Sequence, residues 1–169
     1  MKLRWIVLAT LIVPCGVGAD ARLETVAHVD LDRYVGKWYE LARYPNRFER
    51  ECDRNVTAEY AKQSNGIQVV NTCLKVDGKA KRSEGHAKVE DAATNAKLAV
   101  TFFWPFYGKY WVIDLGENYE YAVVGEPSRK YLWILSRTNS MPDAKYQQIT
   151  QQLSAKGYDP NMLVRTKQD

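Results

Sequence analysis

The stretch GKWYELARYPNRFER, residues 36–50, decides the fold. Gly36 permits a tight backbone turn directly before Trp38, and Pro45 interrupts the extended segment that follows. If this segment is a strand, Trp38 and Ala42 share one face, because side chains alternate along a strand. Two more stretches rich in aromatic residues must also have a place in the fold: FFWPFYGKYW at 102–111 and YLWILSR at 131–137.

Outward from this stretch, the chain shows eight short segments with β-type patterns, separated by turn signals. Their spacing is typical of a sandwich or a barrel. Asn65-Gly66 suits a hairpin turn between the second and third segments, and Gly85 suits a bend in the fourth. The predicted strands are residues 36–44, 55–62, 67–75, 80–90, 96–103, 109–115, 120–125 and 131–137.

After the eighth strand, the apolar residues no longer alternate as in a strand but recur at the spacing of a helix. Residues 140–157 read as one helix, which Ser140 can cap and Gly157 can end, with an apolar stripe through Ile149 and Leu153. Eight antiparallel strands joined by short turns lose their open edges if they close on themselves. The prediction is an all-β protein: an eight-stranded antiparallel up-and-down β-barrel with one C-terminal α-helix packed outside, wide enough for one small ligand.

Closure of the barrel predicts a contact at one of its ends. The first strand starts and the eighth strand finishes at the same end, so Trp38 and Arg137 are expected to meet there. A guanidinium over an indole is favourable by about 0.5–2 kcal/mol. Gly36, Trp38 and Arg137 therefore form a predicted structural floor, and residues 24–34 are free to cross beneath it.

Three motifs in this order resemble those of a known family. Gly36-Lys37-Trp38 resembles the GxW motif of the lipocalins. The segment YEYAVVGEP at 119–127 resembles their middle motif, although the usual Thr-Asp before the tyrosine is missing. Arg137 resembles the basic residue of their last strand. The longer stretches are similar to the bacterial outer-membrane branch of that family, over roughly residues 30–165. The family resemblance implies a cup for small hydrophobic molecules. The branch implies fatty acids or lysophospholipids as ligands and association with the outer membrane.

Strand alternation selects candidate residues for the wall of the cup. The apolar faces of the first, second, fourth and fifth strands are taken as inward, although packing of a solid core would produce the same alternation. In the sixth to eighth strands both faces are apolar, so their inward face stays undecided. The candidate wall residues are Ala42, Val56, Ala58, Tyr60, Ala87, Val89, Leu98, Val100 and Phe102.

The loops at the other end of the barrel form its predicted mouth. Phe48, Trp104 and Phe106 fall in these loops, where they either cover the cup or anchor the loops against the rim. Basic residues nearby could attract an anionic head group, or simply form a solvated rim. These are Arg47, Arg50, Lys79, Lys81, Arg82, Arg129 and Lys130.

The first nineteen residues are read as a signal peptide. Lys2 and Arg4 precede a short apolar run, and Val17-Gly18-Ala19 supplies small residues for cleavage after Ala19. In a rival interpretation IVPCG at 12–16 is a lipobox and Cys15 is lipidated. Either way the protein is expected to be exported, to the periplasm or onto the outer membrane, and residues 20–169 form a single domain.

Cys52 and Cys73 are expected to form a disulfide, because an exported protein with an even pair of cysteines usually oxidises them. The alternative is two free thiols. Register complicates the bond, because a turn at Asn65-Gly66 sets Cys73 opposite Ala58 rather than Cys52. The chain near Cys52 must then fold back over the rim, or a bulge must shift the register.

Composition bounds the function. Hydrophobic residues make up 46% of the 169-residue chain, enough for one sizeable core. Removing the two basic residues of the signal peptide lowers the formal charge from +4 to +2, which argues against nucleic acid as a partner and against an oligonucleotide-binding barrel.

The only histidines are His28 and His86, and no nucleophile motif or metal-ligand spacing is present. The sequence therefore predicts a binding protein without catalytic residues, metal or other cofactor. A lipid-modifying enzyme on the same scaffold is the alternative function, and the choice between monomer and homodimer is left open.

Overall fold

The computed structural model describes residues 22–169. The expected cleavage after Ala19 and the candidate lipidation site Cys15 lie outside these residues. Between residues 22 and 169, no helix is both long enough and apolar enough to cross a membrane.

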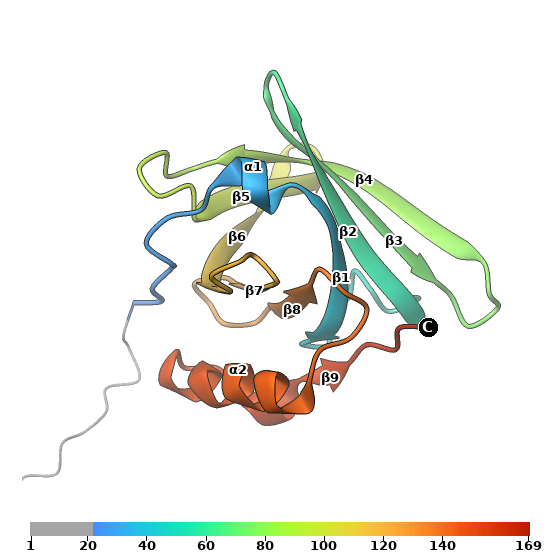
Figure 1. Ribbon diagram of the computed structural model, residues 1–169. Coiled ribbons are helices and arrows are strands. Elements are labelled where there is room, and N and C mark those ends of the chain that lie inside the picture. Colours follow the sequence, from blue (N-terminus) through green and yellow to red (C-terminus); the bar gives the residue numbers. More distant parts are fainter. Residues whose placement is uncertain (1–21) are drawn as a thin grey trace, which may run out of the picture.

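Eight antiparallel strands close into a barrel, as the sequence predicts (Figure 1). Each strand pairs with the next one along the chain, and β1 pairs with both β8 and β2. The strands are β1 (Gly36–Arg43), β2 (Arg54–Gln63), β3 (Gly66–Leu74), β4 (Ala80–Val89), β5 (Lys97–Phe103), β6 (Phe106–Leu115), β7 (Tyr121–Gly125) and β8 (Leu132–Ser136).

The remaining elements surround this barrel. The short helix α1 (Leu31–Tyr34) crosses one end, and α2 (Asp143–Ala155) lies along the outside next to β7 and β8 (Figure 1). A 3-10 turn, η1 (Pro160–Met162), leads into a two-residue strand, β9 (Val164–Arg165), which pairs with β1. The expected Ser140 cap is wrong: α2 starts after Pro142, and no side chain caps it.

Two hairpins differ from their predicted form. Gln63 pairs with Gly66, so the β2–β3 turn is Ser64-Asn65 rather than Asn65-Gly66. This register sets Asn71, not Cys73, opposite Ala58. The sixth strand begins earlier than expected, because Phe103 pairs with Phe106 across a turn of only Trp104 and Pro105. Phe106 thus belongs to β6, and the turn has no room for the longer aromatic loop that the sequence suggested.

The apolar residues form two layers. The inner cluster fills the barrel and includes Trp38, Val112, Val124 and Leu135. The outer cluster lies between the barrel and α2; it contains Ile113, Tyr121, Val123, Leu132 and Ile134 from the strands and Ile149 and Leu153 from the helix. Both faces of β6 to β8 are apolar because one face fills the barrel and the other packs against α2.

Ala42 belongs to the outer cluster, so its assignment to the cup wall is wrong. A β-bulge between Glu40 and Ala42 shifts the register of β1 against β8. Beyond this bulge Ala42 pairs with Ile134, another outer-cluster residue, whereas Arg43 pairs with Trp133, which packs against the inner cluster. One extra residue in the strand exchanges the two faces.

Candidate ligand-binding site

The floor of the barrel is built around Trp38, which is completely buried. The Arg137 guanidinium lies 3.8 Å from the centre of its ring, and the Trp38 indole donates a hydrogen bond of 2.8 Å to the Tyr34 carbonyl. Arg137 also donates to the carbonyls of Lys37 and Tyr34. The predicted contact between Trp38 and Arg137 is therefore present, and it ties β1 and β8 to the segment that crosses the floor.

The inner face of the barrel combines completely buried and partly buried side chains. Trp38, Val112, Ala122 and Val124 have no exposed surface. Other inward residues remain only partly buried while packing against the same inner cluster: Ala58, Val89, Val100, Phe102 and Trp133. We call the barrel interior between the floor and the opposite, open end the cup. Of the predicted wall residues, Ala58, Val89, Val100 and Phe102 pack against the inner cluster, and Tyr60, Ala87 and Leu98 belong to it. Val56 is buried too, but belongs to neither apolar cluster.

Three tyrosines cross the interior just above the floor. The Tyr110 hydroxyl from β6 lies 2.8 Å from that of Tyr34 and 2.9 Å from that of Tyr60 in β2. Burial raises the pKa of Tyr60 to about 12 and raises the pKa values of Tyr34 and Tyr110 well above the ordinary value for a phenol, so all three phenols stay protonated at neutral pH. We call this group the tyrosine shelf. The wall prediction included Tyr60, but sequence alternation alone did not reveal its partners.

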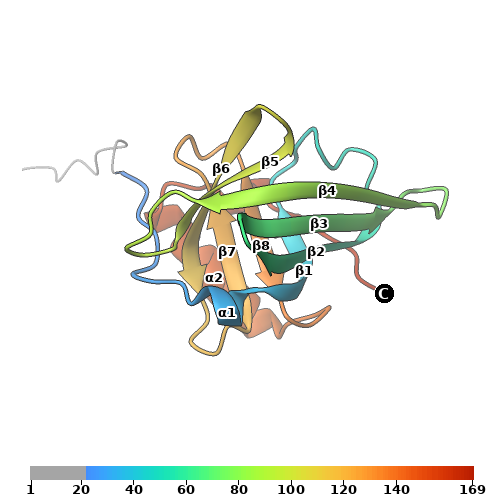
Figure 2. The ribbon, with the colours of Figure 1, turned by 90° about the horizontal axis from the view of Figure 1, so that it is seen from above.

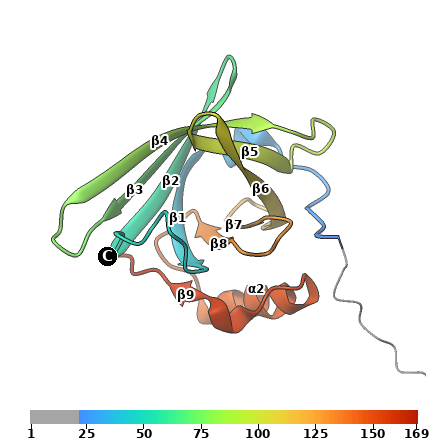
Figure 3. The same cartoon turned by 180° about the vertical axis from the view of Figure 1, so that it is seen from behind.

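The opposite end of the barrel is crossed by the mouth loop, residues 44–53 (Figure 2; Figure 3 shows this end from behind). The Asn46 side chain accepts hydrogen bonds from the backbone of Phe48 and Glu49, which shapes the loop. Phe48 contacts the Tyr131 ring on one side, with 5.7 Å between ring centres, and its carbonyl accepts from Lys81 of β4 on the other. The loop thus spans between strands that are not neighbours in the barrel.

A disulfide joins this loop to β3. Cys52 and Cys73 are bonded, and their Cα atoms lie 5.6 Å apart, which confirms the predicted pair. The turn over the rim and a register shift between Arg54 and Thr57 together bring Cys52 within reach. Both of the rearrangements that the sequence left as alternatives are therefore used. Glu51 adds ion pairs to Lys75 and Lys81, so the loop is anchored at several points.

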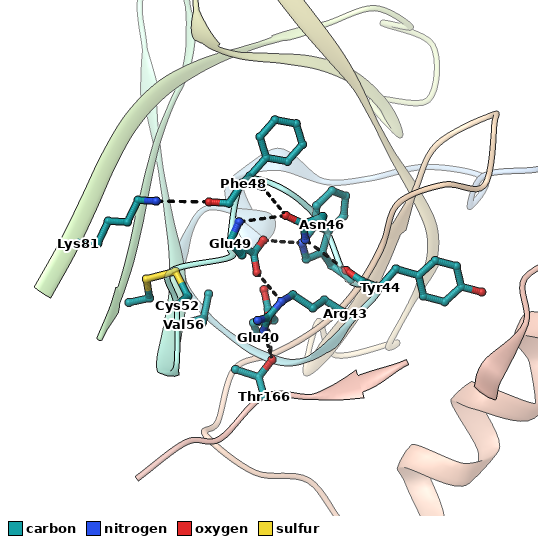
Figure 4. Close-up of polar contacts among 12 residues, drawn as sticks. Glu40, Arg43, Tyr44, Asn46, Phe48, Glu49, Cys52, Val56, Lys81 and Thr166 are labelled. Carbon is teal, nitrogen blue, oxygen red and sulfur yellow. Dashed lines mark hydrogen bonds and ion pairs between the residues drawn. A yellow bond between two sulfur atoms is a disulfide. The ribbon is translucent and has the colours of Figure 1, made fainter. Parts of the chain in front are cut away.

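Beneath the mouth loop lies a buried polar cluster, drawn in Figure 4. Arg43 contacts Glu40 at 2.7 Å and Glu49 at 3.0 Å, and Thr166 donates a short hydrogen bond to Glu40. The Trp133 indole donates to Glu49 at 2.9 Å. This cluster connects the loop, β1, β8 and the C-terminal segment inside the barrel.

The cluster holds two carboxyl groups and one guanidinium. Burial, together with the neighbouring Glu49 carboxylate, raises the pKa of Glu40 to about 8. Protonation of Glu40 leaves one negative and one positive charge, so the buried cluster is neutral at pH 7. The sequence indicated this cluster only through Glu40, which alternation places on the same face as Trp38. Glu49 and Thr166 reach Glu40 from distant parts of the chain, so no local pattern connects them.

The C-terminal segment closes the wall where β1 and β2 separate. These strands pair only from Gly36 to Tyr39, and β9 then takes the place beside Ala42 and Arg43. The Gln168 amide donates to the carbonyls of Glu40 and Val56, both at 2.8 Å. This bridge seals the side of the barrel next to the buried polar cluster.

At the rim, the β5–β6 hairpin projects without cover. Trp104 is 82% exposed and Phe106 78% exposed, whereas Phe48 is 52% exposed above the cup. Several of the predicted basic rim residues are already paired, as Lys79 is with Asp77, Lys81 with Glu51 and Arg82 with Glu84. Arg129 instead donates to the Lys156 carbonyl after α2. These pairings support the solvated-rim interpretation at those positions.

A closed cup with a tryptophan–arginine floor agrees with what comparison with known proteins finds. The sequence model of the family described as the lipocalin-like domain matches residues 29–168 of this chain. The chain belongs to the lipocalin family. This lipocalin is 40% identical to outer membrane lipoprotein Blc of Escherichia coli K12, over 95% of the chain and 92% of that protein. It is 36% identical to the protein of the same name from Vibrio cholerae, over 99% of each chain.

Solved structures support the fold. Insecticyanin from the tobacco hornworm Manduca sexta superposes with a TM-score of 0.70 at 21% identity, covering 87% of this lipocalin and 85% of that chain. The eight-stranded barrel with a helix outside, predicted from the sequence, is confirmed. Within residues 22–169, no group of three or more histidine, cysteine, aspartate or glutamate side chains is arranged to hold a metal ion.

Proposed function

We propose that this lipocalin binds fatty acids or lysophospholipids in its cup and carries or stores them in the cell envelope, for maintenance of membrane lipids. One observation carries the proposal: apolar side chains, several of them only partly buried, line the barrel interior between the Trp38–Arg137 floor and an anchored mouth loop. A concave apolar site with a few polar groups is typical of small-molecule binding. The Blc relatives, named as outer membrane lipoproteins, support a place in the envelope.

The proposal predicts that filling the cup blocks binding. Ala58 is an inward residue beside Trp38, whereas Ala61 on the same strand is exposed. Ala58→Trp should lower the affinity for a long-chain fluorescent fatty acid by about tenfold or more, because the larger side chain competes for the same space. Ala61→Trp is the matched control and should bind as the wild type does. Equal binding by a folded Ala58→Trp variant would contradict a ligand site beside this residue.

Native mass spectrometry tests the ligand class directly. Protein purified from its host should carry fatty acid or lysophospholipid, and added lipid should be recovered chemically unchanged. Turnover of the added lipid would instead favour the lipid-modifying alternative. The intact mass of the exported protein also decides its processing: cleavage after Ala19 and a lipid on Cys15 give different masses.

A further inference from the structure

The tyrosine shelf has one more hydrogen-bond donor than it uses. Each of its three hydroxyls carries one proton, and the shelf contains two hydrogen bonds, Tyr34–Tyr110 and Tyr60–Tyr110. Among residues 22–169, these hydroxyls make no other hydrogen bond. Whichever way the two bonds point, one phenolic proton remains without a protein acceptor.

The position of Tyr110 selects it as the residue that offers this proton. It is the central member of the shelf, so it can accept from both neighbours and still donate its own hydrogen. As whole residues, Tyr34 and Tyr60 are 3% and 7% exposed, whereas the Tyr110 ring keeps some exposed surface beside the inner cluster. A hydroxyl that accepts two hydrogen bonds is also polarised into a stronger donor.

We propose that the Tyr110 hydroxyl binds the carbonyl oxygen of an acyl ligand at the base of the cup, so that the ligand enters with its polar end first. This inference rests on the proposed lipid-binding function and specifies the ligand's orientation. A hydrocarbon tail at this depth would cover the donor and leave it unpaired, which carries a cost. A carbonyl oxygen satisfies it, and the alkyl chain then extends toward Val100 and Phe102.

The charges of the site favour the same orientation. Arg137 lies at the floor, donates only to backbone carbonyls and forms no ion pair within residues 22–169. Its positive charge therefore favours an electron-rich oxygen at the base of the cup. Under the mouth loop, by contrast, Arg43 is already paired with Glu40 and Glu49. The Arg43 guanidinium is thus committed to protein carboxyl groups.

This orientation also narrows the ligand class. Trp38 is completely buried at the floor, and Tyr34 and Tyr60 are almost completely buried beside it, so the base of the cup leaves little accessible surface for a bulky head group. A carboxyl or small ester group fits this position, whereas a phosphate-bearing head group belongs outside the mouth. The structure therefore favours free fatty acids or small acyl esters over lysophospholipids as ligands held in this orientation.

Three fluorescent probes of similar apolar size test the proposal: parinaric acid, its methyl ester, and diphenylhexatriene, which has no hydrogen-bond acceptor. Tyr110→Phe should lower the affinity for the ester about fivefold and for the acid by at least as much, since one hydrogen bond is lost. Diphenylhexatriene should bind the variant within about twofold of the wild type. Losses for both acyl probes indicate recognition of any carbonyl, and a loss for the acid alone indicates recognition of a carboxyl group.

Tyr107→Phe is the matched control, because it removes a tyrosine hydroxyl from the same strand, β6, at an exposed position outside the tyrosine shelf. It should retain the wild-type preference for the acyl probes over diphenylhexatriene. An unchanged preference in Tyr110→Phe, or an equal loss in both variants, would overturn the role of Tyr110. If wild-type protein binds none of the three probes, the proposed function fails instead, so the two failures are distinguishable.

Discussion

Replacing Glu40 by glutamine should make the protein more resistant to unfolding in alkaline solution. Glu40 is 3% exposed, and burial with the Glu49 carboxylate raises its pKa from 4.5 to about 8. The folded state therefore holds this proton more tightly than the unfolded chain does. The resulting stabilisation is largest below about pH 4.5 and disappears as the pH rises through 8.

The size of the effect follows from the shift in pKa. Each unit of pKa corresponds to about 1.4 kcal/mol. The wild-type free energy of unfolding should therefore fall by roughly 3 kcal/mol between pH 5 and pH 8 on account of this residue alone. A glutamine amide has the shape of the protonated acid and can accept from Arg43 and Thr166. Glu40→Gln should match the wild type at pH 5 and exceed its stability by roughly 3 kcal/mol at pH 8.

Urea denaturation at pH 5, 6, 7 and 8, followed by tryptophan fluorescence with the disulfide intact, measures this difference. Other titrating groups are common to both proteins, so they cancel in the comparison. Glu59→Gln, on an exposed part of β2, is the control for loss of a surface charge and should leave the pH profile unchanged. Parallel wild-type and Glu40→Gln profiles would refute a buried proton on Glu40.

Two further predictions concern the ends of the barrel. Trp38→Ala should lower the free energy of unfolding by about 3–5 kcal/mol, and Arg137→Ala should lower it by less. Because the two side chains are in contact, the double variant should lose less stability than the two single losses added together. Additive losses in thermal melts would contradict the floor contact. Reducing the Cys52–Cys73 disulfide, whose partners are 21 residues apart, should lower the free energy of unfolding by about 3 kcal/mol and free the mouth loop. If mass spectrometry finds two alkylated thiols before any reductant is added, the bond is absent.

The sequence determined the barrel and its floor. Eight alternating segments leave two open edges unless they close, and closure brings Trp38 to Arg137 whatever the details of the loops. The disulfide followed from chemistry rather than geometry, because Cys52 and Cys73 are two cysteines in a chain that its sequence predicts to be exported. The inward residues Ala58, Val100 and Phe102 followed from alternation, since in their strands one face is polar and the other apolar.

Tertiary structure decided what local pattern cannot express. Ala42 changes face at a bulge that depends on how β1 meets β8. The inward face of β6 to β8 is set by where α2 packs, because both faces are apolar. The polar groups of the cup come from separate parts of the chain: Glu40 meets Thr166, and Tyr34 meets Tyr110. Alternation reports which side of a strand a residue occupies, but hydrogen-bond partners across a barrel depend on register and closure, which exist only in three dimensions.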